Sequence, residues 1–210
     1  MANNNSKIRK MFFVDGFNLY HSIKRALEKN PALPCCKWLD LEKMCKRFID
    51  TAYESFAGVK YFTALSWKVS SLPKQQTYIN ALQAGSSNIE IIYGKFKLKT
   101  KTCPLCHKSY AGHEEKLTDV NLAISLFENA LKNTFDEAVI VSADSDLIPP
   151  IMAIKNIFPS KYISVLPPFM NSAQDLINHA HKKYKMKENT LTGSQLPDMI
   201  SVYQKPSDWK

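Results

Sequence analysis

Residues 138–148, AVIVSADSDLI, constrain the fold of this chain more than any other stretch. The run from Ala138 to Ser142 is apolar or small, which predicts a short strand buried on both faces, as in a parallel sheet covered by helices. Asp144 and Asp146 follow at once. Ligands of open α/β sheets bind just beyond the carboxyl ends of the strands, so we expect both carboxylates at that edge.

A second stretch has the same layout. Residues 10–14, KMFFV, indicate a buried strand, and Asp15-Gly16-Phe17-Asn18 follows it directly. Acidic side chains at the ends of two strands of one sheet predict a site for a hard cation, because such ions bind through oxygen ligands.

The rest of the chain alternates between helical and strand patterns, which predicts a parallel sheet with right-handed crossovers. Helices are expected over residues 19–27, from Asp40 as N-cap, and over 73–85, 118–131, 147–156 and 172–186. Further strands are expected over residues 59–65, 89–93 and 162–166, the last of these being the final strand of the chain.

Several of these expectations rest on single residues. Gly58 should precede the strand that starts at Val59, and Gly85 should end a helix in the left-handed conformation. Ser172, with Asp175 three residues further on, should cap the final helix. The pattern over 118–131 is the most apolar of the helices, so we expect it to be central and well buried.

The length of 210 residues suits one α/β domain with a sizeable core. We expect a loose N-terminal tail over residues 1–9, one domain over 10–187 that contains an inserted segment at 94–115, and a C-terminal tail over 188–210 without an assigned structure. The insert is rich in lysine, carries two cysteines and two histidines, and is expected to be a hairpin or a knuckle.

Charge and cysteine usage bear on partners and location. The formal charge of +9 favours a polyanionic partner, chiefly nucleic acid, although a solvated surface alone accounts for much of such an excess. No apolar run reaches the length of a signal peptide or a membrane span. The five cysteines are odd in number, and Cys35 and Cys36 are adjacent, so we expect a reduced protein in the cytoplasm.

Four aspartates, Asp15, Asp119, Asp144 and Asp146, are the candidate catalytic and metal-binding residues. Two carboxylates about 4 Å apart repel by roughly 4 kcal/mol at an effective dielectric constant near 20, so such a cluster favours a bound cation. Oxygen ligands select Mg²⁺ or Mn²⁺, which activate water and stabilise charge on a phosphoryl group. The alternative is that these residues only cap helices and form turns.

Two neighbouring polar residues complete this candidate site. Asn18 is expected to hold a carboxylate or the substrate through its amide, and Ser142 to donate to a carboxylate or to a metal-bound water. Phosphodiester hydrolysis is the reaction that suits a basic protein with an acidic, cation-binding pocket.

The runs MFFVDGFNLY, EEKLTDVNLAISLFENA and FDEAVIVSADSDLIPPI resemble the NYN domain, a family of PIN-like ribonucleases related at a distance to the FLAP nucleases. The segments YINALQAGSSNIEIIYGKFKLKT and LPPFMNSAQDL extend the resemblance over about residues 10–182. The resemblance implies a Rossmann-like parallel sheet with helices on both faces and metal-dependent RNA cleavage. It also implies an acidic pocket formed by Asp15, Asn18, Asp119, Asp144 and Asp146.

This chain departs from many relatives at two places. Gln75, Gln76 and Thr77 stand before Tyr78, where relatives have basic residues. Phe169-Met170 follows two prolines, where relatives tend to carry arginine. Both departures concern the surface that contacts the substrate and leave the expected metal ligands intact.

The string Cys103-Pro104-Leu105-Cys106-His107 admits four interpretations. They are haem attachment, a redox dithiol, unligated thiols, and a structural zinc knuckle that uses Cys103 and Cys106 with His107 or His113 and one further ligand. Haem attachment is disfavoured because there is no export signal, and a redox pair is disfavoured because no strand–helix junction surrounds it.

Lysines alternate with other residues just before this string. On a strand, Lys95, Lys97, Lys99 and Lys101 would share one face and could follow a phosphate backbone. With Asn18 and Ser142, the candidate substrate contacts are Lys95, Lys97, Lys99 and Lys116. A solvated surface explains such a run equally well.

The sequence as a whole favours a nuclease that uses Mg²⁺ or Mn²⁺, with structural zinc as an additional metal and RNA as the partner. The alternatives are a non-catalytic RNA-binding module that keeps the fold and a phosphotransferase with an aspartyl nucleophile, which would want a second acid two residues after Asp15. Dinucleotide binding is disfavoured because no G-x-G-x-x-G follows a strand. Self-association is left open.

Overall fold

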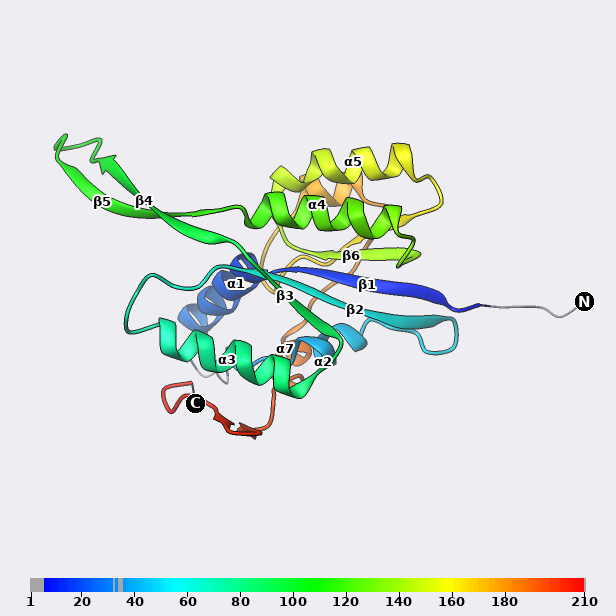
Figure 1. The fold of residues 1–210 in the computed structure, drawn as a ribbon, viewed down its shortest axis with the longest axis horizontal. Helices are drawn as coiled ribbons and strands as arrows, with labels where there is room; N and C mark the ends of the chain where they lie inside the picture. The colour runs from blue at the N-terminus through cyan, green and yellow to red at the C-terminus, as the bar shows by residue number, and fades with distance from the viewer. Residues whose placement is uncertain (1–5, 32, 34–35, 210) are drawn as a thin grey trace, which may run out of the picture.

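The structure, a computed structural model, describes residues 6–31, 33 and 36–209. Within these residues the centre is a six-stranded parallel sheet of order β3-β2-β1-β6-β7-β8 (Figure 1). Its strands are β1 Ile8–Asp15, β2 Glu54–Thr63, β3 Ile89–Tyr93, β6 Glu137–Val141, β7 Tyr162–Val165 and β8 Lys182–Lys183. The predicted α/β fold with a Rossmann-like parallel sheet is confirmed.

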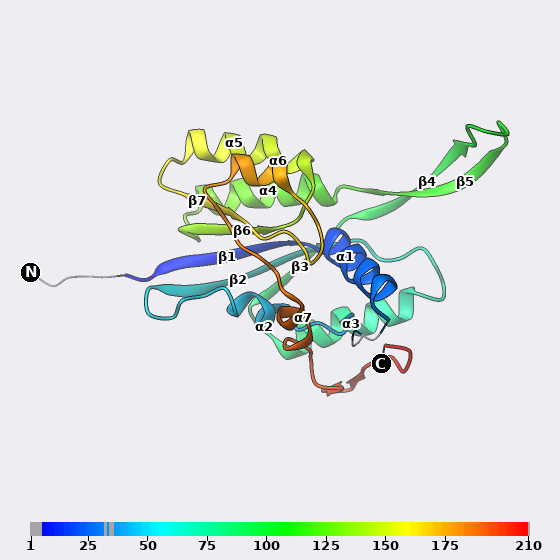
Figure 2. The same ribbon diagram turned by 180° about the vertical axis from the view of Figure 1, so that it is seen from behind.

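Helices cover both faces of this sheet, as Figures 1 and 2 show. One layer contains α1 Gly16–Lys29, α2 Leu41–Lys46, α3 Leu72–Gly85 and α7 Glu188–Thr192. The other layer contains α4 Thr118–Leu131, the 3₁₀ turn η1 Ser145–Leu147, α5 Ile148–Ile157 and α6 Gln174–His179. None of the helices in the described ranges is long and apolar enough to cross a membrane.

The apolar run of β1 explains how one strand serves two cores. Successive side chains of a strand point to opposite faces. Phe12 and Val14 therefore pack in the core under α1, α2 and α3, whereas Met11 and Phe13 pack under α4 and α5. A strand covered on both sides has no polar face, which is why its sequence shows no alternation.

The order of the strands places a crevice at the centre of the sheet. From β1 the chain adds β2 and then β3 on one side, and later adds β6, β7 and β8 on the other. The strand order therefore changes direction between β1 and β6, and this switch point is where open α/β sheets bind their ligands.

The predicted start of β2 is wrong. The strand begins at Glu54, five residues before Val59, and Gly58 lies inside it with a φ of +125°. The pairing with β1 shifts register at this point, because an extra residue forms a bulge. Gly58 was expected to precede the strand. Instead it lies within β2, where its positive φ allows the strand to continue past the bulge.

The predicted final helix over residues 172–186 is also wrong. Helix α6 follows Ala173 without a side-chain cap from Ser172, and it ends at His179. The chain then returns to the sheet, where β8 pairs with Ser164 and Val165 of β7. The expectation that β7 is the last strand fails for the same reason, and a small antiparallel pair, β9 Met199–Ile200 and β10 Tyr203–Gln204, follows further on.

The segment after residue 187, for which the sequence indicated no structure, packs against the α2 and α3 layer. Leu191 and Trp209 belong to the same buried cluster as Trp38, and the two tryptophan rings lie 6.3 Å apart. The indole N–H of Trp38 donates to the carbonyl of Pro197 at 2.7 Å. Leu191 and Trp209 therefore join residues 188–209 to the core of the fold.

Two expectations about helices need correction. The bounds of α4 are those predicted, but Ile124 and Leu131 are 59% and 74% exposed, because only one side of the helix packs on the sheet. Phe127 and Phe158 line a shallow hollow of about 380 Å³ beside them. Gly85 ends α3, but among the described glycines only Gly58 has a positive φ, so the predicted left-handed cap is absent.

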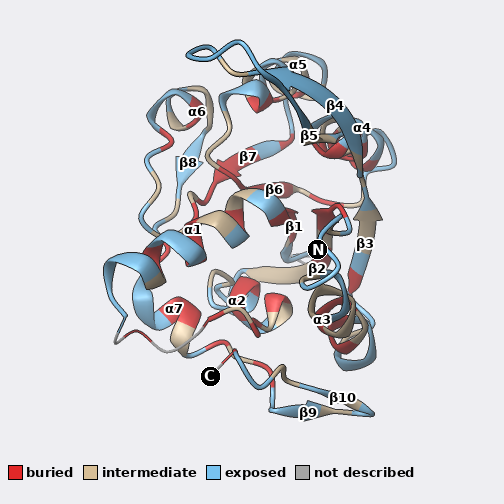
Figure 3. Cartoon of the chain, turned by 90° about the vertical axis from the view of Figure 1, so that its left-hand side faces the viewer, coloured by how far each residue is buried: buried red, intermediate tan, exposed pale blue. Residues whose placement is uncertain are grey.

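The insert is an antiparallel hairpin of β4 Lys95–Thr102 and β5 Ser109–Lys116. It projects from the body of the protein in Figures 1 and 2, and Figure 3 shows it as largely exposed. Its base leads directly from β3 on one side and into α4 on the other.

Gly58→Ala should destabilise the protein by roughly 1–3 kcal/mol, because a side chain strains the backbone at this φ. Gly85→Ala is the matched control: the added Cβ meets only the flexible side chain of Ile200 at 3.3 Å, and the helix gains propensity. Urea unfolding of both variants measures the difference. Equal stability of the two variants would contradict the bulge.

Candidate active site at the β1–β6 crevice

Asp15 lies at the end of β1 and also caps helix α1. Its Oδ1 accepts a hydrogen bond from the backbone N–H of Asn18 at 2.9 Å, and its Oδ2 accepts one from the Ser142 hydroxyl at 2.9 Å. The residue is 2% exposed. The cap sets the start of the helix and the direction of the carboxylate together.

Ser142 connects the two acidic stretches predicted from the sequence. Its hydroxyl donates to Asp15 and accepts the backbone N–H of Asp144 at 3.1 Å, and Asp144 Oδ1 accepts the N–H of Asp146 at 3.0 Å. Ser142 is fully buried, so it has no surface for a substrate. Its contacts make it a positioning residue, which matches the expected donation to a carboxylate.

Asp119 approaches from the opposite wall, in the first turn of α4. The residue before this helix, Leu117, has a φ of +78°, a strained conformation for a side chain of this size. This sharp turn joins β5 to α4 and brings Glu115, which accepts a hydrogen bond from Thr118, to the same side as Asp119. Sequence reasoning missed Glu115, although it stands four residues before Asp119 in the EEKLTD run.

The negative charges of these acids act on one another. Burial, and then the charge of Asp144, raises the pKa of Asp15 against the lowering effect of its hydrogen bonds. Burial and the charges of Asp15, Asp144 and Asp146 raise the pKa of Asp119. Burial and the charges of Asp15 and Asp119 likewise raise the pKa of Glu115.

No positive side chain in the described part of the chain forms an ion pair with these acids. Across the described ranges, the ion pairs of lysine and arginine all go to other acids. The structure therefore places the four predicted aspartates and Glu115 around one edge of the sheet, within electrostatic reach of one another, and gives none of them an ion pair among the described residues.

The donor set fits a hard cation in chemistry and charge. Carboxylate oxygens are the ligands of Mg²⁺ and Mn²⁺, and mutual repulsion of the acids favours a bound cation. No three His, Cys, Asp or Glu side chains in the described part of the chain are already gathered in a geometry that could hold an ion. Carboxylates without a counter-charge repel one another, so these side chains would have to turn toward a common point to bind one metal ion.

Asn18 lies where the sequence predicted. Its amide faces Asp15, and its Oδ1 accepts from Nδ2 of Asn171 at 3.3 Å. Asn171 in turn accepts from the guanidinium of Arg25 at 2.6 Å. Asn171 comes from the loop after β7, and no local pattern pointed to it, because its proximity to Asn18 depends on the fold alone.

The predicted lysine contacts lie on the hairpin, on the face that points away from the carboxylates. Strand alternation puts Lys95, Lys97, Lys99 and Lys116 on one face. Glu115 and Phe96 occupy the other face, where Phe96 meets Phe17 of α1 with ring centroids 6.3 Å apart. Lys99 and Lys116 form ion pairs with Glu114, whose pKa they hold at about 2.

The predicted zinc ligands separate into two places. Cys103 and Cys106 lie in the turn at the tip of the hairpin, where backbone N–H groups of Cys106 and Leu105 lower the pKa of the Cys103 thiol. His107 follows in the same turn. His113 lies four residues beyond Ser109, about 13 Å along the strand, and stacks on Trp67 with centroids 3.8 Å apart. His113 therefore does not join the cysteines.

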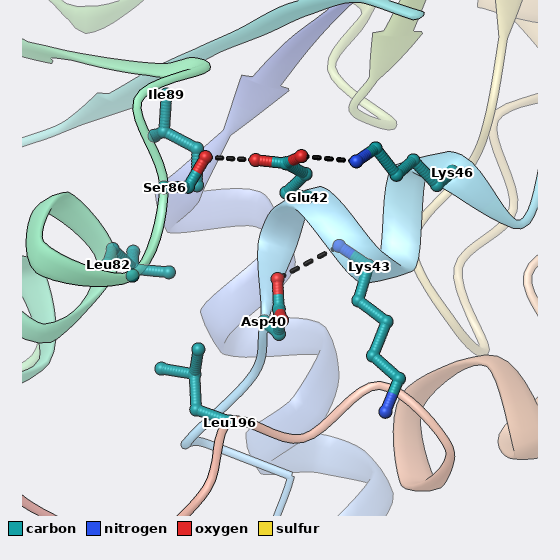
Figure 4. Close-up of a pocket in the computed structure, with 9 residues that line it drawn as sticks. Asp40, Glu42, Lys43, Lys46, Leu82, Ser86, Ile89 and Leu196 are labelled. Carbon is teal, nitrogen blue, oxygen red and sulfur yellow. Dashed lines mark hydrogen bonds and ion pairs between the residues drawn. The ribbon is translucent and has the colours of Figure 1, made fainter. Parts of the chain in front are cut away.

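The hollow in Figure 4 is a separate feature on the α2–α3 side. It has a volume of about 290 Å³ and is bordered by Glu42, which already binds Lys46, Ser86 and Asn88. The carboxylate of Glu42 is therefore already occupied by three partners from the protein itself.

The fold and the site define the class of protein. It is an α/β protein with a Rossmann-like sheet and an acidic crevice at the carboxyl ends of β1 and β6. The chain belongs to the NYN domain family, whose model matches residues 9–187. This family is nuclease-like, acts on nucleic acids and generally uses divalent metals, which supports a hydrolase in general terms.

Two relatives extend the comparison. The 6-hydroxy-3-succinoylpyridine 3-monooxygenase HspA of Pseudomonas putida is 28% identical over an alignment of 244 residues, which covers 96% of this chain and 75% of the relative. The crystal structure of a Vibrio parahaemolyticus protein of unknown function superposes with a TM-score of 0.62 at 17% identity, over 93% of this chain and 100% of that one. The second likeness supports the fold.

Asp119→Asn should change the dependence of stability on pH. Because the pKa of Asp119 is raised in the folded protein, the folded state binds more protons than the unfolded chain above the ordinary carboxyl pKa. The free energy of unfolding contributed by this group therefore falls as pH rises through that window. The variant should gain roughly 0.2–1 kcal/mol over the parent at neutral pH, since solvent screens this exposed group.

Urea unfolding at pH 4.5 and pH 7.5, without divalent metal, measures this effect. Asp175→Asn, in the first turn of α6, is the matched control and should show no gain at neutral pH. A loss of stability in Asp119→Asn that grows with pH would show that Asp119 is stabilised, not opposed, by its surroundings.

Proposed function

We propose that this protein is a metal-dependent nuclease that hydrolyses phosphodiester bonds in RNA. The observation that carries the proposal is that five carboxylates, from β1, β5, α4 and the loop after β6, lie around the central switch point within electrostatic reach of one another and form no ion pair among the described residues. These residues are Asp15, Glu115, Asp119, Asp144 and Asp146. Membership of the nuclease-like NYN family supports the same reaction class.

Each side chain of the crevice has a role in this reaction. Asp15, Asp119, Asp144 and Asp146 would hold Mg²⁺ or Mn²⁺. When bound, such an ion lowers the pKa of a water ligand and stabilises charge on a phosphoryl oxygen. Ser142 fixes the direction of Asp15 through its hydroxyl, and the amide of Asn18, steadied by Asn171, faces both Asp15 and the open crevice.

RNA as substrate is supported by the charge distribution and by the family. The net charge of +9 attracts a polyanion, and the hairpin whose base adjoins the crevice carries a row of lysines on the face turned away from the carboxylates. Arg25, held by Asn171 near the end of α1, is a further cationic group close to the acids and could bind a substrate phosphate.

A non-catalytic RNA-binding module is the second candidate function. It is favoured by one observation: the described acids do not already form a three-ligand metal group. The monooxygenase activity in the name of the Pseudomonas relative belongs to that protein, which is 28% identical to this chain.

The odd cysteine count and the buried thiol of Cys45 support a reducing, cytoplasmic setting.

Purified protein should cleave end-labelled single-stranded RNA in the presence of Mg²⁺ or Mn²⁺ and not in EDTA. Asp144→Asn and Asp119→Asn should each lower kcat by about 100-fold or more, because a ligand that stabilises the transition state by several kcal/mol is lost. Asp175→Asn is the control and should retain activity, since it lies outside the crevice.

The outcomes separate the two candidates. Metal-dependent cleavage that the crevice variants abolish supports the nuclease. Salt-dependent RNA binding without cleavage by any of the proteins would identify a binding module. Equal cleavage by all variants would reveal a contaminating enzyme and remove the support for catalysis. Parallel reactions with DNA of the same sequence test the choice of RNA.

Lys97→Ala should weaken RNA binding and reduce the dependence of log Kd on log salt by about 1, the effect of losing one phosphate contact. Lys97 has no ion pair within the described residues, so its charge is available to a phosphate. Lys132→Ala, which removes a lysine that pairs with Glu128 at the far end of α4, is the control. An unchanged slope for Lys97→Ala would place the RNA elsewhere.

A further inference from the structure

The tip of the β4–β5 hairpin is a tight turn that contains Cys103 and Cys106. The N–H of His107 donates to the carbonyl of Cys103 at 2.9 Å, and the N–H of Cys103 donates to the carbonyl of Lys108 at 3.0 Å. The backbone N–H groups of Leu105 and Cys106 and the side chain of Cys106 lie near the thiol of Cys103, whose pKa they lower. Two thiols are thus held side by side at a spacing typical of a zinc-binding turn.

This turn supplies half of a zinc site. Structural Zn²⁺ takes four ligands in a tetrahedron. Across the described residues, no third His, Cys, Asp or Glu is gathered with Cys103 and Cys106 to hold a metal. His113 stacks on Trp67 well down the hairpin, and the thiols of Cys36 and Cys45 are buried in the core.

The position of the tip prevents the body of the same chain from completing the site. Each strand of the hairpin has eight residues, which corresponds to about 25 Å. Figures 1 and 2 show the tip pointing away from the sheet and all its helices. Since no described residue completes the site, we look to another molecule for the further ligands.

We infer that the hairpin tips of two copies of this chain meet at one Zn²⁺, which is bound by Cys103 and Cys106 of each copy. Four thiol protons are released as four thiolates bind the ion, and the metal changes neither its oxidation state nor that of sulfur. The inference concerns assembly and holds whether or not the carboxylates cleave RNA.

The charge around the tip suits a four-thiolate centre. Zinc with four thiolates carries a charge of −2. Lys101 and Lys108 flank the cysteines on exposed positions, so two copies bring four ammonium groups to its surroundings. The bodies of the two proteins are both basic, but two hairpins keep them apart by far more than the Debye length of about 8–10 Å, so their repulsion is screened.

An exposed apolar residue supports the same contact. Leu105 lies between the two cysteines and is 91% exposed, the largest exposure of any large apolar residue described. Tip-to-tip association would cover this side chain with its counterpart. A zinc site closed within one chain would leave it in water.

The test uses full-length protein purified under reducing conditions, with the metal content measured by mass spectrometry and the molar mass by light scattering. We expect one zinc per two chains and a mass twice that of the 23.9 kDa monomer. A strong chelator should convert the dimer into monomers, and zinc alone should restore it. Cobalt substituted for zinc should saturate at half an equivalent and give the spectrum of a tetrahedral four-thiolate centre.

Variants separate this site from its alternatives. Cys103→Ser and Cys106→Ser should lose both zinc and the dimer, whereas His107→Ala and His113→Ala should keep both. One zinc per monomer, loss of zinc in either histidine variant, or a dimer that survives chelation and Cys106→Ser would overturn the inference. Absence of zinc binding by the reduced protein would overturn it as well.

Discussion

The hydrogen bond from Ser142 to Asp15 joins the carboxyl ends of β1 and β6. The register in which β1 pairs with β6 makes this hydrogen bond possible, and the candidate site depends on it. Val14 lies opposite Val141, so the next residues of the two strands are also level. A shift by one residue would turn the apolar side chains to the wrong layer and separate the two acidic turns. The packing of the two cores therefore also fixes the position of the chemistry.

The buried charged side chains at the two ends of β1 differ in whether an ion pair compensates their charge. At the amino end, Lys10 is fully buried but lies 2.6 Å from Glu54 and 3.5 Å from Glu137, and it donates to the Tyr184 hydroxyl at 2.8 Å. A buried charge without such partners costs several kcal/mol. At the carboxyl end, Asp15 has hydrogen bonds but no ion pair among the described residues, so its buried charge is not balanced by a neighbouring cation.

The hairpin is built differently from the rest of the molecule. It buries little of its surface, and its base is fixed by Phe96 against Phe17 and by His113 against Trp67. Beyond these contacts its stability comes from the pairing of β4 with β5. The hairpin therefore contributes little to the core. Its exposed lysines and its cysteine turn are instead available for binding.

Local sequence patterns determined a large part of the fold. Apolar runs predicted β1, β3 and β6, the helical period gave the bounds of α4, and Asp40 caps α2 as expected, because these features depend on neighbours within a few residues. The positions of the four aspartates near strand ends or a helix start follow from the sequence, and their joint role as metal ligands stays a prediction. The sequence did not reveal the Gly58 bulge, the return of the chain through β8, the packing of Trp209, the approach of Glu115 to Asp15 or the contact of Asn171 with Asn18. Those were decided by the tertiary structure, since each is a contact between distant segments whose free energy exists only once the sheet has formed.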